Sequence, residues 1–156
     1  MGNTKPIGVA YEDQDIIGAD NLSAADIYAS DEIGYTAAAQ STVTQATSKS
    51  TGVTINASAG QITMNNAALG ATTNVAFTMT NSKVSAKDVV VVNVAGGVAS
   101  NETYNCWVSG QTAGACTFVL RNISGGSLSE AVVLNFAIIH CTEHGQKERL
   151  SGRRPR

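Results

Sequence analysis

The sequence predicts an all-β protein: an antiparallel β-sandwich of jelly-roll-like type with an extended N-terminal arm. Three observations lead to this prediction. Short apolar runs recur at roughly ten-residue spacing, Gly, Asn and Ser separate them, and no segment has the period of an amphipathic helix. The 156 residues suit a single domain. Charged residues make up only 14%, below the roughly 25% of typical soluble domains.

Charge divides the chain into three parts, which we take as its domain organisation. Residues 1–40 hold Lys5 against seven acidic residues, a net charge of −6, whereas residues 41–139 carry +1 and residues 140–156 carry +3. We therefore predict an acidic N-terminal arm (1–40), a β-sandwich body (41–139) and a basic tail (140–156). The tail has no apolar periodicity, so we expect it to be disordered and dispensable for folding.

The predicted arm is too apolar for a solvated tail, yet its apolar residues follow no regular period. The entropy cost of ordering such a segment must be offset by docking on another surface. We expect that surface to belong to a partner or a neighbouring subunit, and the acidic residues to make the contact salt-sensitive. The residues expected at this interface are Ile7, Val9, Tyr11, Ile16, Ile17, Ile27, Tyr28, Ile33 and Tyr35.

Seven strands are expected in the body. Strict alternation of apolar and polar residues over 74–80 and 130–139 predicts half-buried strands. Four successive valines, Val89 to Val92, favour a strand covered on both faces. The remaining strands are expected at 52–56, 60–64, 103–109 and 115–122.

The last two of these strands are predicted to form a hairpin around residues 110–114. Cys106 and Cys116 lie symmetrically about Gln111, so symmetric pairing would place them directly opposite each other, close enough for a disulfide. Reduced thiols are the alternative, favoured if the protein matures in a cytosol. Trp107 should point to the face opposite Cys106, either into the core or as an interface anchor.

Catalytic and cofactor chemistry finds little support in the residues. His140 and His144, the only histidines, lie beyond the body, which therefore lacks a Ser-His-Asp set. Together with Cys141 they offer three zinc ligands, but a polar tail lacks the rigid frame of such sites, and we predict no metal. We accordingly expect no catalytic residues, no cofactor and no enzymatic activity.

Two classes of partner are also not expected. A net charge of −2 argues against a nucleic-acid partner. No window contains the roughly 18 consecutive apolar residues of a membrane span, and no apolar signal core follows Met1, so neither a membrane partner nor secretion is expected.

Several stretches of the chain resemble one family. They are residues 43–56 (VTQATSKSTGVTIN), 60–64 (GQITM), 77–82 (FTMTNS), 88–93 (DVVVVN), 120–131 (LRNISGGSLSEA) and 135–139 (NFAII). Together they resemble small β-structural proteins from the virions of tailed bacteriophages. The opening residues 4–11 (TKPIGVAY) are similar to the start of members that decorate capsids. The cysteine pair and the basic tail depart from this pattern.

The resemblance implies a capsid decoration (cement) protein on the outer surface of the virion, bound to the major capsid protein. The composition agrees, because a surface of few charges is cheap to bury against other subunits. Local threefold positions on an icosahedral shell favour a homotrimer. The alternative implied by the same resemblance is a tail-fibre or tailspike module involved in host receptor binding.

Overall fold

The computed structural model describes residues 26–141, which form an all-β protein, as predicted. Residues 26–33 belong to a separate unit of the chain and form neither helix nor strand. The body begins at Gly34, earlier than the expected boundary at residue 41. A 3₁₀ turn, η1 (Ala37–Ala39), precedes eight strands: β1 (Gln40–Thr44), β2 (Val53–Thr54), β3 (Ala59–Thr63), β4 (Asn74–Thr80), β5 (Val89–Gly96), β6 (Tyr104–Thr112), β7 (Ala115–Asn122) and β8 (Val133–Ile139).

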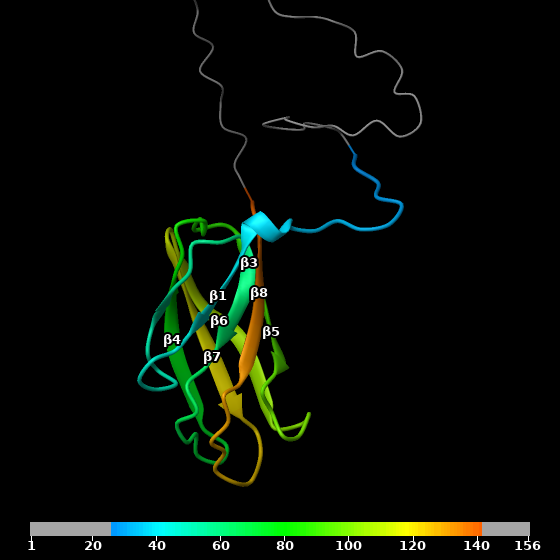
Figure 1. Ribbon diagram of the computed structural model, residues 1–156. Helices are drawn as coiled ribbons and strands as arrows, with labels where there is room; N and C mark the ends of the chain where they lie inside the picture. Colours follow the sequence, from blue (N-terminus) through cyan, green and yellow to red (C-terminus); the bar gives the residue numbers. More distant parts are fainter. Residues whose placement is uncertain (1–25, 142–156) are drawn as a thin grey trace, which may run out of the picture. The chain divides into compact units, whose positions relative to one another are not determined.

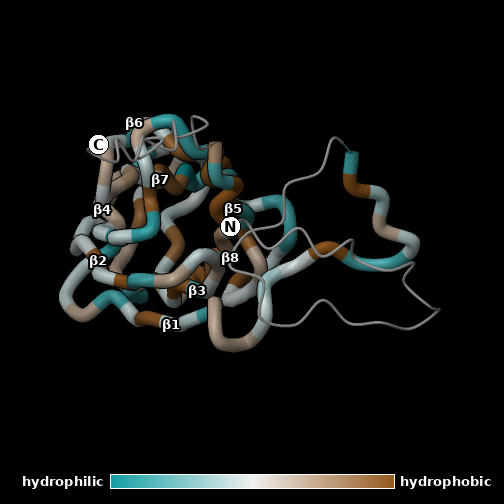
Figure 2. The backbone as a smooth tube through the Cα atoms, turned by 90° about the horizontal axis from the view of Figure 1, so that it is seen from above, coloured by the Kyte–Doolittle hydropathy of each residue, from teal (hydrophilic) through white to brown (hydrophobic). Residues whose placement is uncertain are grey.

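The strands form two four-stranded sheets in a β-sandwich-like arrangement (Figure 1). The first sheet has the order β1-β3-β8-β5 and the second the order β2-β4-β7-β6. Figure 2 shows these two sets of strands as two layers. Sequence patterns identified seven of the eight strands and missed β1, whose residues QSTVT include a single larger apolar side chain.

The sheets are mixed, so the prediction of a purely antiparallel fold is wrong at two strand pairs. β1 runs parallel to β3, and β2 runs parallel to β4. Every connection except the β6–β7 hairpin passes from one sheet to the other, so strands two apart along the chain run in the same direction. Where two such strands are also neighbours, they pair in parallel. This departs from a jelly roll, in which the strands are antiparallel.

The core lies between the two sheets. Phe118 of the second sheet packs edge-on against Phe77 of the same sheet, with ring centroids 5.7 Å apart, and contacts Phe136 of the first sheet at 6.4 Å. The alternation predicted for β4 and β8 is confirmed, because Phe77, Met79, Leu134, Phe136 and Ile138 are all buried. These apolar side chains hold the two layers together.

Strand β5 corrects a second expectation. Its valines were predicted to be covered on both faces, but burial alternates along the strand, leaving Val89 51% and Val91 49% exposed. The reason is that the first sheet is one of two layers, so only the inner face of β5 packs against the core and no described strand covers its outer face. A continuous apolar run therefore marked an apolar outer surface here rather than a central strand.

The β6–β7 hairpin turns later in the sequence than expected. Thr112 pairs with Ala115, so the turn contains only Ala113 and Gly114, and Gly114 has a φ of +82°. A β-bulge between Val108 and Gly110 then shifts the register by one residue. Both features move the symmetry centre of the hairpin away from Gln111.

The cysteine pairing predicted from that symmetry is therefore wrong. Cys106 lies opposite Leu120, and Cys116 lies opposite Gln111. Both thiols are free. Burial raises the pKa of Cys116 to about 11 and also raises that of Cys106, which suits buried, unreactive thiols.

Candidate interaction surfaces

The described part of the arm exposes its apolar side chains. Ile27 is 62% exposed, Tyr28 90% and Ile33 79%. Much of the apolar surface of these three side chains is thus open to solvent. The other expected interface residues, Ile7, Val9, Tyr11, Ile16 and Ile17, lie outside the described residues.

Tyr35 differs from the other expected interface residues because it belongs to the body. Its hydroxyl donates to the backbone carbonyl of Ile138 on β8. Its own carbonyl accepts a hydrogen bond of 2.8 Å from the Gln40 side chain. Tyr35 is thus bonded to the first sheet through its hydroxyl and through its backbone carbonyl, and the residue is only 37% exposed.

Both sheets present nearly uncharged outer faces. The eight strands contain a single charged residue, Arg121 on β7. On the first sheet, positions that alternate with the core residues carry only amide, hydroxyl and aliphatic side chains. They are Gln40, Thr42, Thr44, Ala59, Gln61, Thr63, Val89, Val91, Asn93, Val133, Asn135, Ala137 and Ile139. Such a face is cheaper to desolvate than a charged one.

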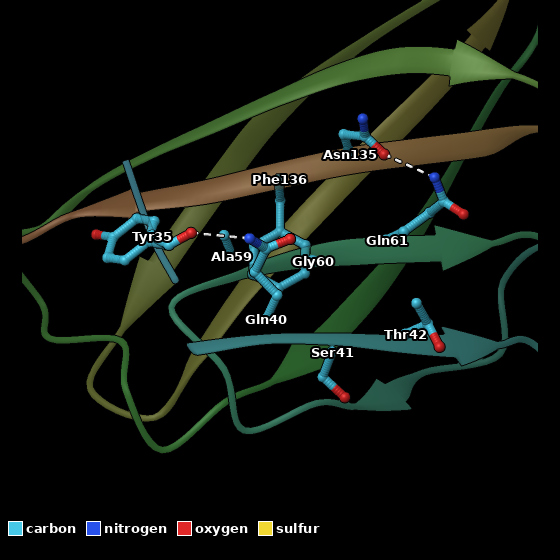
Figure 3. A pocket seen from close by; sticks show the side chains of 9 residues that line it. All are labelled: Tyr35, Gln40, Ser41, Thr42, Ala59, Gly60, Gln61, Asn135 and Phe136. Atoms are coloured by element: carbon cyan, nitrogen blue, oxygen red, sulfur yellow. Dashed lines mark hydrogen bonds between the residues drawn. The ribbon is translucent and has the colours of Figure 1, made fainter. Parts of the chain in front are cut away.

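A hollow of about 650 Å³ lies on the first sheet, next to Tyr35 (Figure 3). It spans β1, β3 and β8. Ala59 and Gly60 are the smallest residues that line it. A side chain at Gly60 has no room, because a Cβ atom there would lie 2.2 Å from the carbonyl oxygen of Ser41. In the same hollow, the Gln61 side chain donates to Asn135 Oδ1 at 3.0 Å.

Trp107 lies on the outer face of the second sheet, opposite Val119 of β7. It is 36% exposed, whereas Val119 is only 7% exposed although it faces outward. Trp107 is therefore not a core residue. Of the two roles expected for Trp107, the core role is thus wrong, and that of an interface anchor stays a prediction.

Lys49 is the most unusual buried residue of the body, with 3% exposure. Its Nζ donates to the backbone carbonyls of Asn65, at 2.6 Å, and Glu130. Burial lowers the pKa of Lys49, and the charge of Glu130 opposes that shift. Gln45 closes the cluster by donating to the Lys49 carbonyl at 3.1 Å and accepting from the Asn65 N–H at 3.1 Å.

This Lys49 cluster explains what part of the stretch 43–56 does in the fold. Its lysine and glutamine join the loop after β1 to the loops after β3 and before β8. The ammonium donates to two backbone carbonyls and the residue is only 3% exposed, so the described contacts of Lys49 are structural. Sequence reasoning missed it because a lone lysine among hydroxyl residues normally indicates a solvated loop.

Tyr104 and Glu130 form a second buried polar contact. Burial is the main cause and the nearby Glu130 carboxylate the second cause that raise the pKa of Tyr104 to about 12. Neither Tyr104 Oη nor Glu130 Oε2 has a partner in good hydrogen-bond geometry. The other carboxylate oxygen, Oε1, accepts from the Ala99 N–H at 2.7 Å. A phenol with so high a pKa stays protonated near neutral pH and is unsuited to act as a base.

Asp88 anchors the end of β8. Its carboxylate accepts from the backbone N–H groups of Ser85 at 2.8 Å and Cys141 at 3.1 Å, and lies 3.0 Å from His140 Nδ1. Burial acts to raise the pKa of Asp88, but these contacts together outweigh it and lower the pKa. His140 and Cys141, which the charge pattern had assigned to the tail, are thus bonded to the body.

The possible zinc ligands do not assemble in the described part of the chain. Within residues 26–141, no group of three His, Cys, Asp or Glu side chains is placed to hold a metal ion. His144, the third ligand considered, lies outside that range.

Comparison with family models, with curated proteins and with solved structures finds no match to this chain. The described residues also contain no helix long and apolar enough to cross a membrane.

Proposed function

We propose that the chain is a structural protein of a tailed-bacteriophage virion. In this proposal it decorates the outside of the capsid, contacts the major capsid protein through an extended N-terminal arm, and stabilises the shell. The observation that carries the proposal is the exposure of Ile27, Tyr28 and Ile33 on an acidic segment without helix or strand. A segment of this kind gains order only by docking.

The body supplies further support. Its strands carry one charged residue, Arg121, so either broad face can be covered at low desolvation cost. A decoration protein needs such area to contact neighbouring subunits, and we include a homotrimer in the proposal on this ground. Sedimentation equilibrium tests the trimer, and a monomer at all accessible concentrations contradicts it.

Deletion of residues 1–33 tests the arm. The boundary follows the structure, because Tyr35 and Gln40 are bonded within the body. The truncated body should keep its thermal transition but no longer co-sediment with shells of the phage that encodes it. A matched triple variant, Ile27→Ser, Tyr28→Ser and Ile33→Ser, should weaken binding while leaving the charge of the arm unchanged. Full binding by both proteins contradicts the proposal.

Location on the particle separates decoration from the alternative. Electron microscopy of intact virions should show density for the chain on the outside of the head, repeated at equivalent positions of the shell. Density confined to the tail contradicts decoration and supports the tail-fibre or tailspike alternative.

A further inference from the structure

The hollow on the first sheet has a lining that carries no charge. The side chains around it on the outer face are the ring of Tyr35, the amides of Gln40, Gln61 and Asn135, the Thr42 hydroxyl and the small Ala59. The volume of about 650 Å³ falls within the range of small-molecule sites. A charged ligand would find no counter-charge here, and a wholly apolar one would leave the amides unpaired, which costs free energy.

Two of the amides hold each other in place. Gln61 and Asn135 face each other across the β3–β8 pair, and Gln61 Nε2 donates to Asn135 Oδ1 at 3.0 Å. The remaining oxygen of Gln61 and nitrogen of Asn135 have no hydrogen-bond partner within residues 26–141. The pair therefore presents one acceptor and one donor group side by side. Exchanging oxygen and nitrogen in both amides leaves the same two kinds of group available.

Tyr35 bounds the hollow with its ring, beside Ala59 in Figure 3. Its hydroxyl is already bonded to the Ile138 carbonyl, and its backbone oxygen is bonded to Gln40. The ring is thus positioned before any ligand binds, and it offers an apolar surface rather than a hydroxyl. Pre-positioned groups lose little conformational entropy on binding.

We propose that this hollow binds a neutral saccharide. A sugar hydroxyl both donates and accepts, which matches the free donor and acceptor of the Gln61–Asn135 pair. The C–H face of a sugar ring is apolar and matches the Tyr35 ring. The hydroxyl of Thr42 lies in the same lining for a further contact. The inference does not depend on whether the chain sits on the head or the tail of a virion.

The test uses the full chain, labelled with ¹⁵N, and a panel of lactose, maltotriose, chitotriose and mannotriose at concentrations up to roughly 10 mM, where weak sites are populated. At least one of these saccharides should shift the side-chain amide signals of Gln61 and Asn135. Asn135→Ala should weaken that binding about tenfold, the effect expected for one lost hydrogen bond. Asn93→Ala is the matched control, since Asn93 lies on the same outer face but does not line the hollow.

A second pair of variants tests the aromatic wall. Tyr35→Phe should retain binding, because the ring remains, whereas Tyr35→Ala should lose it. Backbone spectra of each variant report whether the body is still folded. The inference is overturned if no saccharide shifts the two amides, or if Asn135→Ala and Asn93→Ala bind alike. It is also overturned if only an uncharged peptide, added as an extended strand, shifts these signals.

Discussion

Two truncations that differ by two residues test how the body ends. The Asp88 side chain has no accessible surface, and two of its three hydrogen-bond partners are supplied by His140 and Cys141. A chain ending at Cys141 keeps both partners, whereas a chain ending at Ile139 loses them. The charge pattern alone predicted that both truncations would be neutral.

The expected cost follows from the hydrogen bonds removed. Each bond to a charged group contributes about 1.5–3 kcal/mol, and water admitted by the deletion replaces part of the loss. We therefore expect the 1–139 chain to be less stable than the 1–141 chain by about 1.5–3 kcal/mol. For a body of this size that lowers Tm by at least about 6 °C.

Differential scanning calorimetry of the two truncations and the full chain measures the difference. The 1–141 chain should melt with the full-length protein. Because the 1–139 chain also places a new carboxylate near Asp88, His140→Ala in the 1–141 chain isolates the side-chain contact and should cost part of the same stability. Equal Tm values for the 1–139 and 1–141 chains would refute the reasoning.

Three further perturbations test other parts of the body. The pKa of Asp88 is lower in the folded than in the unfolded protein, so its contribution to stability is complete above the unfolded pKa of about 4. That contribution is lost as the pH falls through the folded pKa. Acid titrations of the stability of Asp88→Asn should lack this component. Gly60→Ala should destabilise the body by about 1–3 kcal/mol in urea, since its Cβ would meet the Ser41 carbonyl oxygen. Gly125→Ala, the control with open space around it, should change stability by less than about 0.5 kcal/mol. Similar values for both variants would contradict the close approach of Gly60 to Ser41. Lys49→Ala leaves two partly buried carbonyls without this donor and should cost about 1–3 kcal/mol, with an unchanged urea midpoint as the contrary result.

The strands and much of the core were predictable from local pattern. In β4 and β8, apolar residues alternate with polar ones, and one buried face of a strand requires just this period. The same rule placed Trp107 on the face opposite Cys106, because successive side chains on a strand point to opposite sides. These features depend on a few neighbouring residues, so the sequence contains them directly.

Other features depend on which segments meet in space, and no local pattern encodes them. Val89 and Val91 are exposed because no described strand covers the outer face of the first sheet, and Cys106 does not lie opposite Cys116 because a two-residue turn and a bulge set the register. Lys49 is buried because two other loops supply carbonyl oxygens to its ammonium.

The sequence by itself thus determined the all-β class, the apolar face of the core strands, and an acidic segment that carries irregularly spaced apolar residues. Only the tertiary structure decided the two parallel strand pairs, the partners of Asp88, and the hollow beside Tyr35. The physical reason is the distance along the chain between the residues that make each feature. Alternation along a strand follows from the bonds between adjacent residues, whereas Asp88 meets His140, and Gln61 meets Asn135, across separations of 52 and 74 residues. Those contacts exist only once the strands of the first sheet have paired and brought distant segments within hydrogen-bonding distance.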